Sequence, residues 1–328
     1  MKVVVTGGAG FIGAHLTRAL LARGCEVVVL DDLSTGARSN LLGLPVKLVL
    51  GSVTDRDLME ETCAGARSIV HLAARPSVER SLLDPMATHD VNATGTLTVL
   101  DVAQRSETHV VVVSSSSVYG GSDGRPRAED DPPRPRSPYA ASKLAAEGYA
   151  LGYQASFGLP TLVVRLFNVY GPYQSARHAY AAVIPSFIDA ALCGCPLTVH
   201  GDGRQTRDFT YVEVVAAMLA DAACRALTHP RPVNLAFGTS TDLLSLIAHL
   251  EGILGRRLEV THVAPRAGDV SNSQAQTETM RSLFGAVKGP DLLTTLEATV
   301  EWYRARLGEP PEPTTGPADA TRSARTVR

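Results

Sequence analysis

The sequence predicts an α/β protein built on a doubly wound parallel sheet, with a smaller C-terminal lobe. Two observations lead to this class. Short apolar runs alternate with helical patterns through the first half of the chain, as expected when helices cover both faces of a parallel sheet. The second half is less regular and richer in turns, which suits a small lobe over the sheet. The 328 residues leave room for both parts.

The expected elements follow in chain order. Strands are predicted where β-branched and apolar residues run together, at residues 3–5, 26–30, 47–50, 68–73, 109–114 and 161–166. Helices are predicted where apolar residues recur at helical spacing, and Pro185 suits the first turn of one of them. The predicted helices are residues 11–23, 57–64, 86–104, 183–193, 213–226, 242–254 and 291–307.

Turns and the final segment complete the layout. Gly24 is placed to end the first helix, and Asn92 is expected to open a helix and to cap it or reach a neighbouring strand end. Residues 168–172 are predicted to form a turn and residues 174–182 a polar loop. Residues 308–328 lack apolar periodicity and are rich in Pro, Thr and Arg, so we expect a disordered tail.

Composition narrows the class of protein. The hydrophobic fraction is 45% and the net charge is −2, which gives no basis for expecting nucleic acid or a membrane as a partner. No apolar run has the length of a membrane span. Met1 leads directly into the first strand, so we expect no signal peptide and a soluble, cytoplasmic protein. The five scattered cysteines, Cys193 and Cys195 included, predict neither a disulfide framework nor a metal site.

The strongest motif is the glycine series Gly7, Gly10 and Gly13 between the first strand and the first helix. Glycines at these positions allow a tight turn, close approach of backbone N–H groups to a pyrophosphate, and close packing of helix on strand. The helix N-terminus then faces the diphosphate with its unpaired N–H donors. Asp31 ends the second strand, where a carboxylate accepts both ribose hydroxyls of NAD and repels the 2′-phosphate of NADP.

NAD is therefore the expected cofactor, and its further contacts are assigned to neighbouring positions. Small residues at the end of the fourth strand allow the cofactor to approach the backbone, and polar residues follow the second strand. The assigned contacts are Phe11, Ile12, Asp32, Ser34, Thr35, Gly36, Ser52, Val53, Leu72, Ala73, Ala74 and Asn92.

Tyr139 and Lys143 form the candidate acid/base pair. They are four residues apart at the start of a predicted helix, so their side chains share one helix face. An ammonium group near a phenol favours the phenolate and lowers the tyrosine pKa from about 10. The pair would then supply a general base at neutral pH.

These motifs together resemble the extended short-chain dehydrogenase/reductase family, which contains the nucleotide-sugar epimerases and dehydratases. The spacing G-x-x-G-x-x-G is that family's variant, and Tyr139 and Lys143 match its Tyr-x-x-x-Lys pair. The resemblance covers residues 1–307 and implies a Rossmann-like fold with bound NAD. It implies that Lys143 also holds the nicotinamide ribose. It further implies that Ser115, four residues before Tyr119, shares the O4 proton of the substrate with Tyr139.

The resemblance also implies how the chain is divided. Residues 1–167, with parts of 209–238, would form the NAD-binding domain, and residues 168–208 and 239–307 the UDP-sugar-binding lobe. In that lobe Asn168 would contact the diphosphate, Arg207 and Arg266 would clamp it, and Asp269 would orient a hydroxyl or Arg266. The segment that resembles the uracil-packing segment contains Val183, Ile184, Pro185 and Phe187. Ser52 stands where the family usually has an Asp at the adenine, so this chain departs from the family at that contact.

The residues after Ser115 bear on the reaction. Dehydratases of the family resemble Thr-Asp-Glu there and decarboxylases Thr-Ser-Glu, whereas this chain has Ser116 and Ser117 and no acid. Elimination of water would lack its acid/base pair, so 4-epimerisation of a UDP-sugar is the favoured reaction. A dehydratase or decarboxylase and a non-catalytic NAD-binding regulator are the alternatives, and the Ser/Tyr/Lys set argues against the regulator.

The hexose is less well specified. Ser77, Ser116 and Ser117 offer hydroxyls to a C6 carboxylate, which makes UDP-glucuronate the first choice. UDP-glucose/UDP-galactose follows closely, and UDP-N-acetylglucosamine stays open because Ser273 is a small residue four positions after Asp269. By the same resemblance we expect a homodimer joined through residues 86–104 and 139–156.

Overall fold

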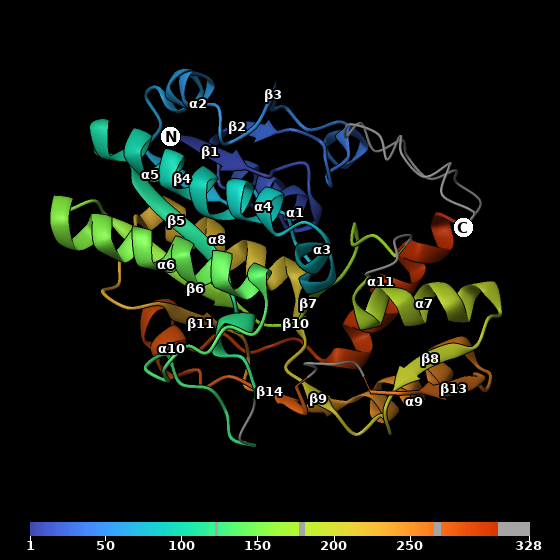
Figure 1. Cartoon of the computed structure of the whole chain (residues 1–328). Coiled ribbons are helices and arrows are strands. Elements are labelled where there is room, and N and C mark those ends of the chain that lie inside the picture. The colour runs from blue at the N-terminus through green and yellow to red at the C-terminus, as the bar shows by residue number, and fades with distance from the viewer. Residues whose placement is uncertain (122–123, 177–180, 266–269, 308–328) are drawn as a thin grey trace, which may run out of the picture.

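The computed structural model describes residues 1–121, 124–176, 181–265 and 270–307. Two parts are visible in it: a large sheet with helices on both faces, and a smaller lobe that contains α7, α9 and α11 (Figure 1). The predicted tail at 308–328 lies outside the described residues, as do Arg266 and Asp269.

The large part is built on a parallel sheet whose seven strands, all within the described residues, have the order β11-β6-β5-β4-β1-β2-β3. Every neighbouring pair is parallel. The strand order reverses at β1, so the carboxyl ends of β1 and β4 flank the crevice where doubly wound sheets bind ligands. The strands are β1 (Lys2–Thr6), β2 (Glu26–Asp31), β3 (Lys47–Leu50), β4 (Ser68–His71), β5 (His109–Ser115), β6 (Thr161–Leu166) and β11 (Val233–Leu235).

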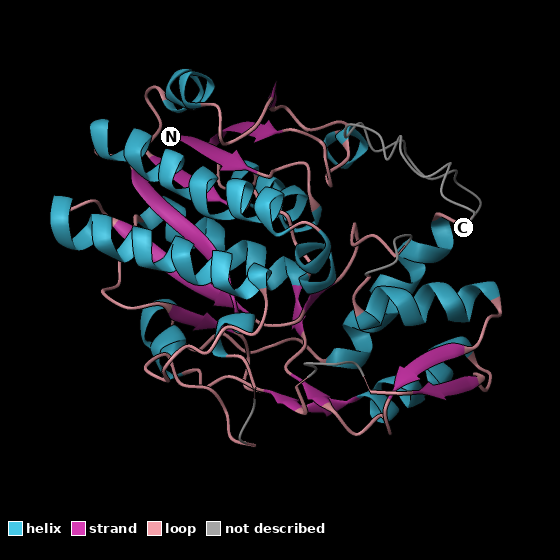
Figure 2. Cartoon of the chain, in the orientation of Figure 1, coloured by secondary structure: helices cyan, strands magenta, loops and turns pink. Residues whose placement is uncertain are grey.

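Each face of the sheet is covered by helices (Figure 2). α1 (Phe11–Leu21) and α8 (Val212–Arg225) pack on one face, and α2 (Arg56–Cys63), α5 (Gly95–Arg105) and α6 (Pro138–Phe157) cover the other. Alternate strand residues point to opposite faces. Val3 and Val5 therefore join the core under α1 and α8, while Val4 joins the core under α5 and α6. Burial on both faces explains why these strands are continuous apolar runs.

The smaller lobe has its own apolar core. It is formed by α7 (Val183–Cys193), α9 (Leu243–Leu254) and α11 (Leu292–Ala305), with β8 (Leu197–His200) paired to β13 (Val260–Val263). Two further small sheets, β10-β7 and β12-β9-β14, are separate from the seven-stranded sheet. They involve β7 (Val169–Tyr170), β9 (Thr206–Arg207), β10 (Thr210–Tyr211), β12 (Thr241–Asp242) and β14 (Asn272–Ser273). The remaining elements are α10 (Glu278–Phe284) and the short 3-10 turns η1 (Arg38–Leu41) and η3 (Ser116–Tyr119).

Four expectations need correction. The helix predicted at 86–104 is divided into α4 (Pro85–His89), a π-helical turn η2 (Asp90–Thr94) and α5, and it is preceded by α3 (Val78–Leu83). Asn92 lies inside the π turn and does not open or cap a helix. The turn predicted at 168–172 contains β7, because backbone pairing with β10 extends Val169 and Tyr170. Asp242 and Asp291 precede their helices as N-caps, since their carboxylates accept hydrogen bonds from N–H groups in the first turn.

Candidate functional site

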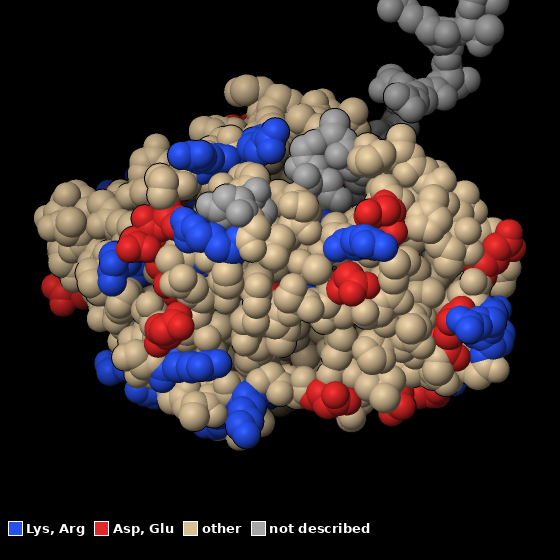
Figure 3. Space-filling model, turned by 90° about the horizontal axis from the view of Figure 1, so that it is seen from below, with Lys and Arg blue, Asp and Glu red and all other residues tan. Residues whose placement is uncertain are grey.

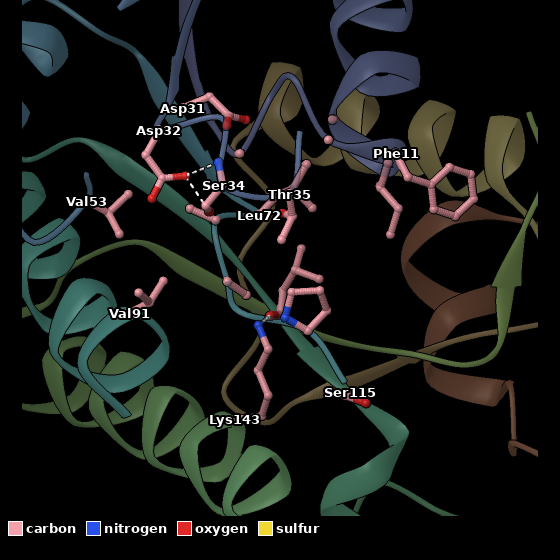
Figure 4. A pocket seen from close by; sticks show the side chains of 18 of the residues that line it. Phe11, Asp31, Asp32, Ser34, Thr35, Val53, Leu72, Val91, Ser115 and Lys143 are labelled. Atoms are coloured by element: carbon pink, nitrogen blue, oxygen red, sulfur yellow. Dashed lines mark hydrogen bonds between the residues drawn. The ribbon is translucent and has the colours of Figure 1, made fainter. Parts of the chain in front are cut away.

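A pocket of about 330 Å³ opens at the carboxyl ends of β1, β2, β4, β5 and β6. Asp31 and Asp32 lie at one end of it, and Ser115 and Lys143 lie at the other (Figure 4). The pocket thus joins the two groups of residues that were singled out at separate places in the sequence.

The glycine turn forms one wall of the pocket. A Cβ atom added at Gly7 would lie 2.7 Å from the backbone nitrogen of Ala73, and one added at Gly13 would lie 2.2 Å from the carbonyl oxygen of Gly7. Gly7 also has φ +71°, a conformation that favours glycine. Within the described residues, no side chain accepts a hydrogen bond from the N–H groups at the start of α1, and the first turn of α1 has no acidic residue. The N–H donors at this helix end therefore suit an anionic group such as a pyrophosphate.

Asp31 ends β2 and lines the pocket, with 6% of its surface exposed. Its Oδ2 accepts a hydrogen bond from the N–H of Ala9 at 2.9 Å, and its Oδ1 accepts one from the N–H of Leu33 at 2.8 Å. Burial raises the pKa of Asp31, and these two hydrogen bonds oppose the shift. The more exposed carboxylate of Asp32 accepts from both the N–H and the hydroxyl of Ser34.

Most of the predicted cofactor contacts line this pocket. They are Gly7, Gly10, Phe11, Ile12, Gly13, Asp31, Asp32, Ser34, Thr35, Ser52, Val53, Leu72, Ala73, Ala74, Tyr139 and Lys143. Gly36 is not among the lining residues; an added Cβ there would lie 2.8 Å from the carbonyl carbon of Ala9, so Gly36 packs against the glycine turn.

Asn92 is also absent from the lining residues. Its Oδ1 accepts a hydrogen bond from the N–H of Arg75 at 2.7 Å, and its amide donates to the hydroxyl of Ser142 at 2.9 Å. Asn92 thus holds the loop after β4 against α6, where the loop forms the edge of the pocket.

Ser115, Tyr139 and Lys143 meet at the inner end of the pocket. Burial raises the pKa of Tyr139, and its hydrogen bond with Ser115 lowers it. The lowering of that pKa by Lys143, expected from the sequence, does not appear in the structure. The ammonium group of Lys143 instead donates to the carbonyl oxygen of Val113 at 2.9 Å. Burial lowers the pKa of Lys143 from 10.5 to about 8, and the carboxylate of Glu147 acts in the opposite direction.

The serines after β5 form the start of η3. Ser115 caps this turn, because its hydroxyl oxygen accepts a hydrogen bond from the N–H of Ser117 at 3.2 Å. The hydroxyl oxygen of Ser117 is buried and has no hydrogen-bond partner among the described residues. A buried hydroxyl without a partner is unfavourable in a folded chain, so Ser117 Oγ is an unsatisfied group at the start of η3.

The residues assigned to the sugar nucleotide are more dispersed. Asn168 lines the pocket, and its amide donates to the hydroxyl of Ser273 at 3.3 Å. Arg207 in β9 donates to the carbonyl oxygens of Thr206 and Val270. Ser77 caps α3 and donates to the Glu79 carboxylate at 2.9 Å. Neither Ser77 nor Arg207 lines the pocket, and the same holds for Ser116 and Ser117.

The segment assigned to the uracil ring forms the start of α7. Ile184 and Phe187 have exposed fractions of 1% and 2% and belong to the core of the smaller lobe, and Pro185 is also buried. Val183 is half-buried and is the member of this group with an accessible side chain.

Several pocket residues were missed from the sequence. Val113, Ser114, Pro76 and Val91 line the cavity and were not assigned a contact from the sequence. Two of them come from β5, and the carbonyl oxygen of Val113 is the acceptor for Lys143. A backbone carbonyl acceptor cannot be recognised from the sequence, because every residue type carries one.

Other kinds of site find no support in the described residues. No group of three His, Cys, Asp or Glu side chains within them has the arrangement of a metal site. All five cysteines are free thiols, although the sulfur atoms of Cys25 and Cys224 lie 3.6 Å apart.

On the face seen from below, Lys and Arg side chains are interspersed with Asp and Glu (Figure 3). Within the described part of the chain, every helix is too short or too polar to cross a membrane.

Comparison with known proteins adds to this geometry. Residues 3–236 match the NAD dependent epimerase/dehydratase family. A UDP-glucose 4-epimerase of Mycolicibacterium smegmatis is 35% identical over 311 residues, which cover 93% of this chain and 99% of the relative.

Two solved structures show the same fold. A UDP-N-acetylglucosamine 4-epimerase from Methanobrevibacter ruminantium M1, in complex with UDP-N-acetylmuramic acid, superposes with a TM-score of 0.88 at 32% identity. That alignment covers 93% of this chain and 98% of the other. A UDP-glucuronic acid 4-epimerase from Bacillus cereus, in complex with UDP-glucuronic acid and NAD, has a TM-score of 0.85 at 29% identity and covers 93% and 99%.

The residues of the pocket fit NAD. The glycine turn leaves no room for side chains, the α1 N-terminus presents free N–H donors, and Asp31 lies at the end of β2. The cofactor of the enzyme is NAD. The chain therefore belongs to the NAD dependent epimerase/dehydratase family.

Proposed function

We propose that this enzyme catalyses 4-epimerisation of a UDP-sugar through a 4-keto intermediate, with UDP-glucuronate as the first choice of substrate. The observation that carries the proposal is the meeting of Ser115, Tyr139 and Lys143 in the same pocket as the glycine turn and Asp31. A base, a hydroxyl and a dinucleotide site in one cavity suit oxidation and reduction at a single carbinol carbon.

Each of these side chains has a definite task in the proposed reaction. Tyr139 takes the O4 proton and later returns it, and the hydroxyl of Ser115 shares that proton through its hydrogen bond with Tyr139. Lys143 binds the nicotinamide ribose, and the hydrogen bond from Ser115 is the contact that favours the phenolate of Tyr139. NAD, when bound, supplies the acceptor and donor of the C4 hydride. Asn168, Val183 and the two arginines Arg207 and Arg266 hold the UDP portion, so that the sugar ring can turn between the two hydride transfers.

The absence of acids after Ser115 favours epimerisation over elimination. Ser116 and Ser117 form the start of η3 and follow Ser115 directly in the chain, at positions where loss of water would need an acid/base pair. A 4-epimerase needs no such pair.

The same serines support the choice of a uronate. The hydroxyl of Ser117 lacks a partner within the described chain and lies two residues from Ser115, but it is buried and does not line the pocket, so it reaches a C6 carboxylate only if the start of η3 shifts. A carboxylate at C6 would accept hydrogen bonds from hydroxyls placed there, and such charge-assisted bonds are stronger than neutral ones. The hydroxyl of Ser77 is already engaged with Glu79, which makes it a weaker candidate.

UDP-glucose/UDP-galactose follows the uronate closely, and UDP-N-acetylglucosamine is a further candidate because Ser273 is a short side chain in direct contact with Asn168. A small residue beside the diphosphate site leaves room for an N-acetyl group. UDP-glucose needs neither a donor to a C6 carboxylate nor space for an N-acetyl group. Its interconversion with UDP-galactose is the third reaction to be tested.

A panel of these three UDP-sugars with purified, NAD-loaded protein tests the proposal. We expect UDP-galacturonate from UDP-glucuronate, with unchanged mass and an inverted C4 centre in the proton NMR spectrum. No turnover of the uronate would refute the substrate choice. Loss of water or of CO₂ in the product mass would refute epimerisation, and failure with every sugar nucleotide would favour a non-catalytic NAD-binding role.

The proposal includes a homodimer and a cytoplasmic location. α3 and α4 carry the exposed side chains of Leu82, Leu83 and Met86, and both helices pack beside α6, where Tyr149 is 41% exposed. This apolar surface adjoins the helices expected to join two subunits. A sedimentation or scattering mass equal to one 34.7 kDa chain would contradict the dimer.

A pair of equally exposed leucines gives a matched test of that surface. Leu83 and Leu42 are both 72% exposed, but Leu42 lies beside η1 on another part of the molecule. We expect Leu83→Asp to shift the protein toward monomer at micromolar concentration and Leu42→Asp to leave the mass unchanged.

A further inference from the structure

Three side chains on α6 hold this helix against β5 at one-turn intervals. Tyr139, Lys143 and Glu147 are spaced by four residues, so they lie along one face of the helix. Tyr139 is hydrogen-bonded with Ser115, Lys143 donates to the carbonyl oxygen of Val113, and Glu147 accepts from the hydroxyl of Ser114. Successive turns of α6 are therefore tied to three consecutive residues of β5.

Glu147 has the most extensive set of partners of the three. Its carboxylate is 2% exposed and accepts hydrogen bonds from the Ser114 hydroxyl at 2.5 Å, from Nε of Arg165 at 2.9 Å and from Nη2 of Arg165 at 2.7 Å. Arg165 is 3% exposed and lies in β6, where it is the register partner of Ser114 in β5. One carboxylate thus joins α6 to the ends of two adjacent strands.

Stability alone does not explain this arrangement. A buried ion pair is often no more stabilising than apolar side chains of the same volume, because both charges lose their hydration. We therefore look for the role of Glu147 in its effect on Lys143 and Tyr139, which lie one and two turns away on the same helix face.

We propose that Glu147 is a positioning residue for Lys143 and Tyr139: through Ser114 and Arg165 it holds α6 in register with β5 and places a fixed negative charge one turn below the Lys143 ammonium. This role deepens the proposed function, on which it rests for its effect on turnover.

The charge has a direct effect on Lys143. The ionisable groups that act on or are acted on by this ammonium are Glu147 from α6 and His71 from β4, while Tyr139 lies one turn away on the same helix face. Burial lowers the pKa of His71 to about 3, so its ring is neutral and contributes no charge. Arg165 is paired with Glu147 at 2.7 Å. Glu147 is therefore the neighbour that favours the charged form of Lys143, in opposition to burial.

The test measures the titration of Lys143 itself. The chain contains only four lysines, Lys2, Lys47, Lys143 and Lys288, so a protein labelled with ¹³C-lysine gives few Cε signals. The Lys143 signal is assigned by its loss in Lys143→Arg. Titration is carried out on the full chain, with and without NAD.

Two variants separate the charge of Glu147 from its contribution to folding. Glu147→Gln keeps the shape but leaves Arg165 without a counter-charge, whereas the double variant Glu147→Met/Arg165→Met removes both charges together. Lys143 should titrate at a lower pH in both, by roughly one pH unit or more (a tenfold change in proton affinity) in Glu147→Gln and by less in the double variant. The other three lysines should not move.

Ser114→Ala serves as the control, since it removes one hydrogen bond but leaves both charges in place. It should leave the Lys143 titration unchanged. A Lys143 titration that is unchanged in a folded Glu147→Gln or double variant would overturn the proposal.

Turnover gives the second readout. In Glu147→Gln and in the double variant, kcat should fall by about tenfold or more with little change in KM, because positioning of the base affects the reacting step more than binding. The alkaline limb of the pH–rate profile should move in the same direction as the Lys143 titration. If wild-type protein turned over no sugar nucleotide, the proposed function would fail, yet the NMR titration would still decide the role of Glu147.

Discussion

The backbone N–H of Ala9 donates a hydrogen bond to Oδ2 of Asp31 at 2.9 Å, across 22 positions of the sequence. This bond ties the glycine turn after β1 to the end of β2. Oδ1 of the same carboxylate accepts from the N–H of Leu33. Asp31 therefore organises the glycine turn as well as offering its remaining lone pairs to a ribose, so the two halves of the NAD site support each other.

Asp31→Asn tests this double role. One carboxylate oxygen would become an NH₂ group that faces a backbone N–H donor, which should cost about 1–3 kcal/mol of unfolding free energy. We expect weaker NAD binding and a smaller preference for NAD over NADP, because the negative charge is lost. Urea unfolding and titration calorimetry with both cofactors measure the two effects. Unchanged stability would show that the Ala9 bond contributes little.

Tyr139→Phe should reduce turnover by roughly 10²–10⁴-fold, since a positioned general base contributes that much. NAD binding should change little, because the lost hydroxyl interacts with Ser115 rather than with the glycine turn. Tyr153→Phe removes a hydroxyl from a distant turn of the same helix, at a residue that does not line the pocket, and should retain activity. Full activity of Tyr139→Phe would exclude the phenol as the base.

Gly13→Ala should abolish NAD binding and destabilise the fold. Its Cβ would lie 2.2 Å from the carbonyl oxygen of Gly7 and 2.5 Å from the Cα of Gly8, so the backbone of the turn would have to move. Gly252→Ala is the matched control: it lies within α9 and its Cβ would meet open space. That substitution should stabilise the protein by up to about 1 kcal/mol. Thermal unfolding with and without NAD compares the pair.

Lys143→Met should inactivate the enzyme and stabilise its fold. Burial lowers the pKa of Lys143 from 10.5 to about 8, so below pH 8 the folded chain carries a charge that is disfavoured by about 3 kcal/mol relative to the unfolded chain. Between pH 8 and 10.5 the unfolded chain binds more protons, and this penalty is relieved as the pH rises.

The stability difference between Lys143→Met and wild type should therefore be largest below pH 8 and should shrink toward pH 10.5. Denaturant unfolding across this range measures it. Lys47→Met, at an exposed position, should stay within about 0.5 kcal/mol of wild type at all pH values. A stability difference that does not depend on pH would show that the burial of the Lys143 charge is not its cause.

Much of the fold was predictable from local pattern. The strands at 47–50 and 161–166 have the predicted bounds, and so does α7 at 183–193. Parallel strands buried on both faces are apolar throughout, which makes them easy to recognise. The π turn around Asn92 was not predictable, because it depends on contacts with Arg75 and Ser142 from other elements.

In the candidate site, too, some residues could be identified from the sequence and others only from the structure. The glycines, Asp31, Tyr139 and Lys143 were identifiable because each is a residue type tied to one chemistry at a fixed spacing. Glu147 lies one further turn along the same helix face, and extending the spacing of Tyr139 and Lys143 by four positions would have found it. Its importance follows from Ser114 and Arg165, which come from two other strands.

By itself the sequence determined the fold class, the NAD site and the residue types available for proton transfer, because turns, strands and helix faces follow from local chemistry. Only the tertiary structure decided how those residues act on one another. Burial, and not proximity to Lys143, is the main influence on the pKa of Tyr139, and the Lys143 ammonium is directed to a backbone carbonyl. Desolvation and hydrogen-bond direction depend on the packing of α6 against β5 and β6, and no spacing along the chain records them.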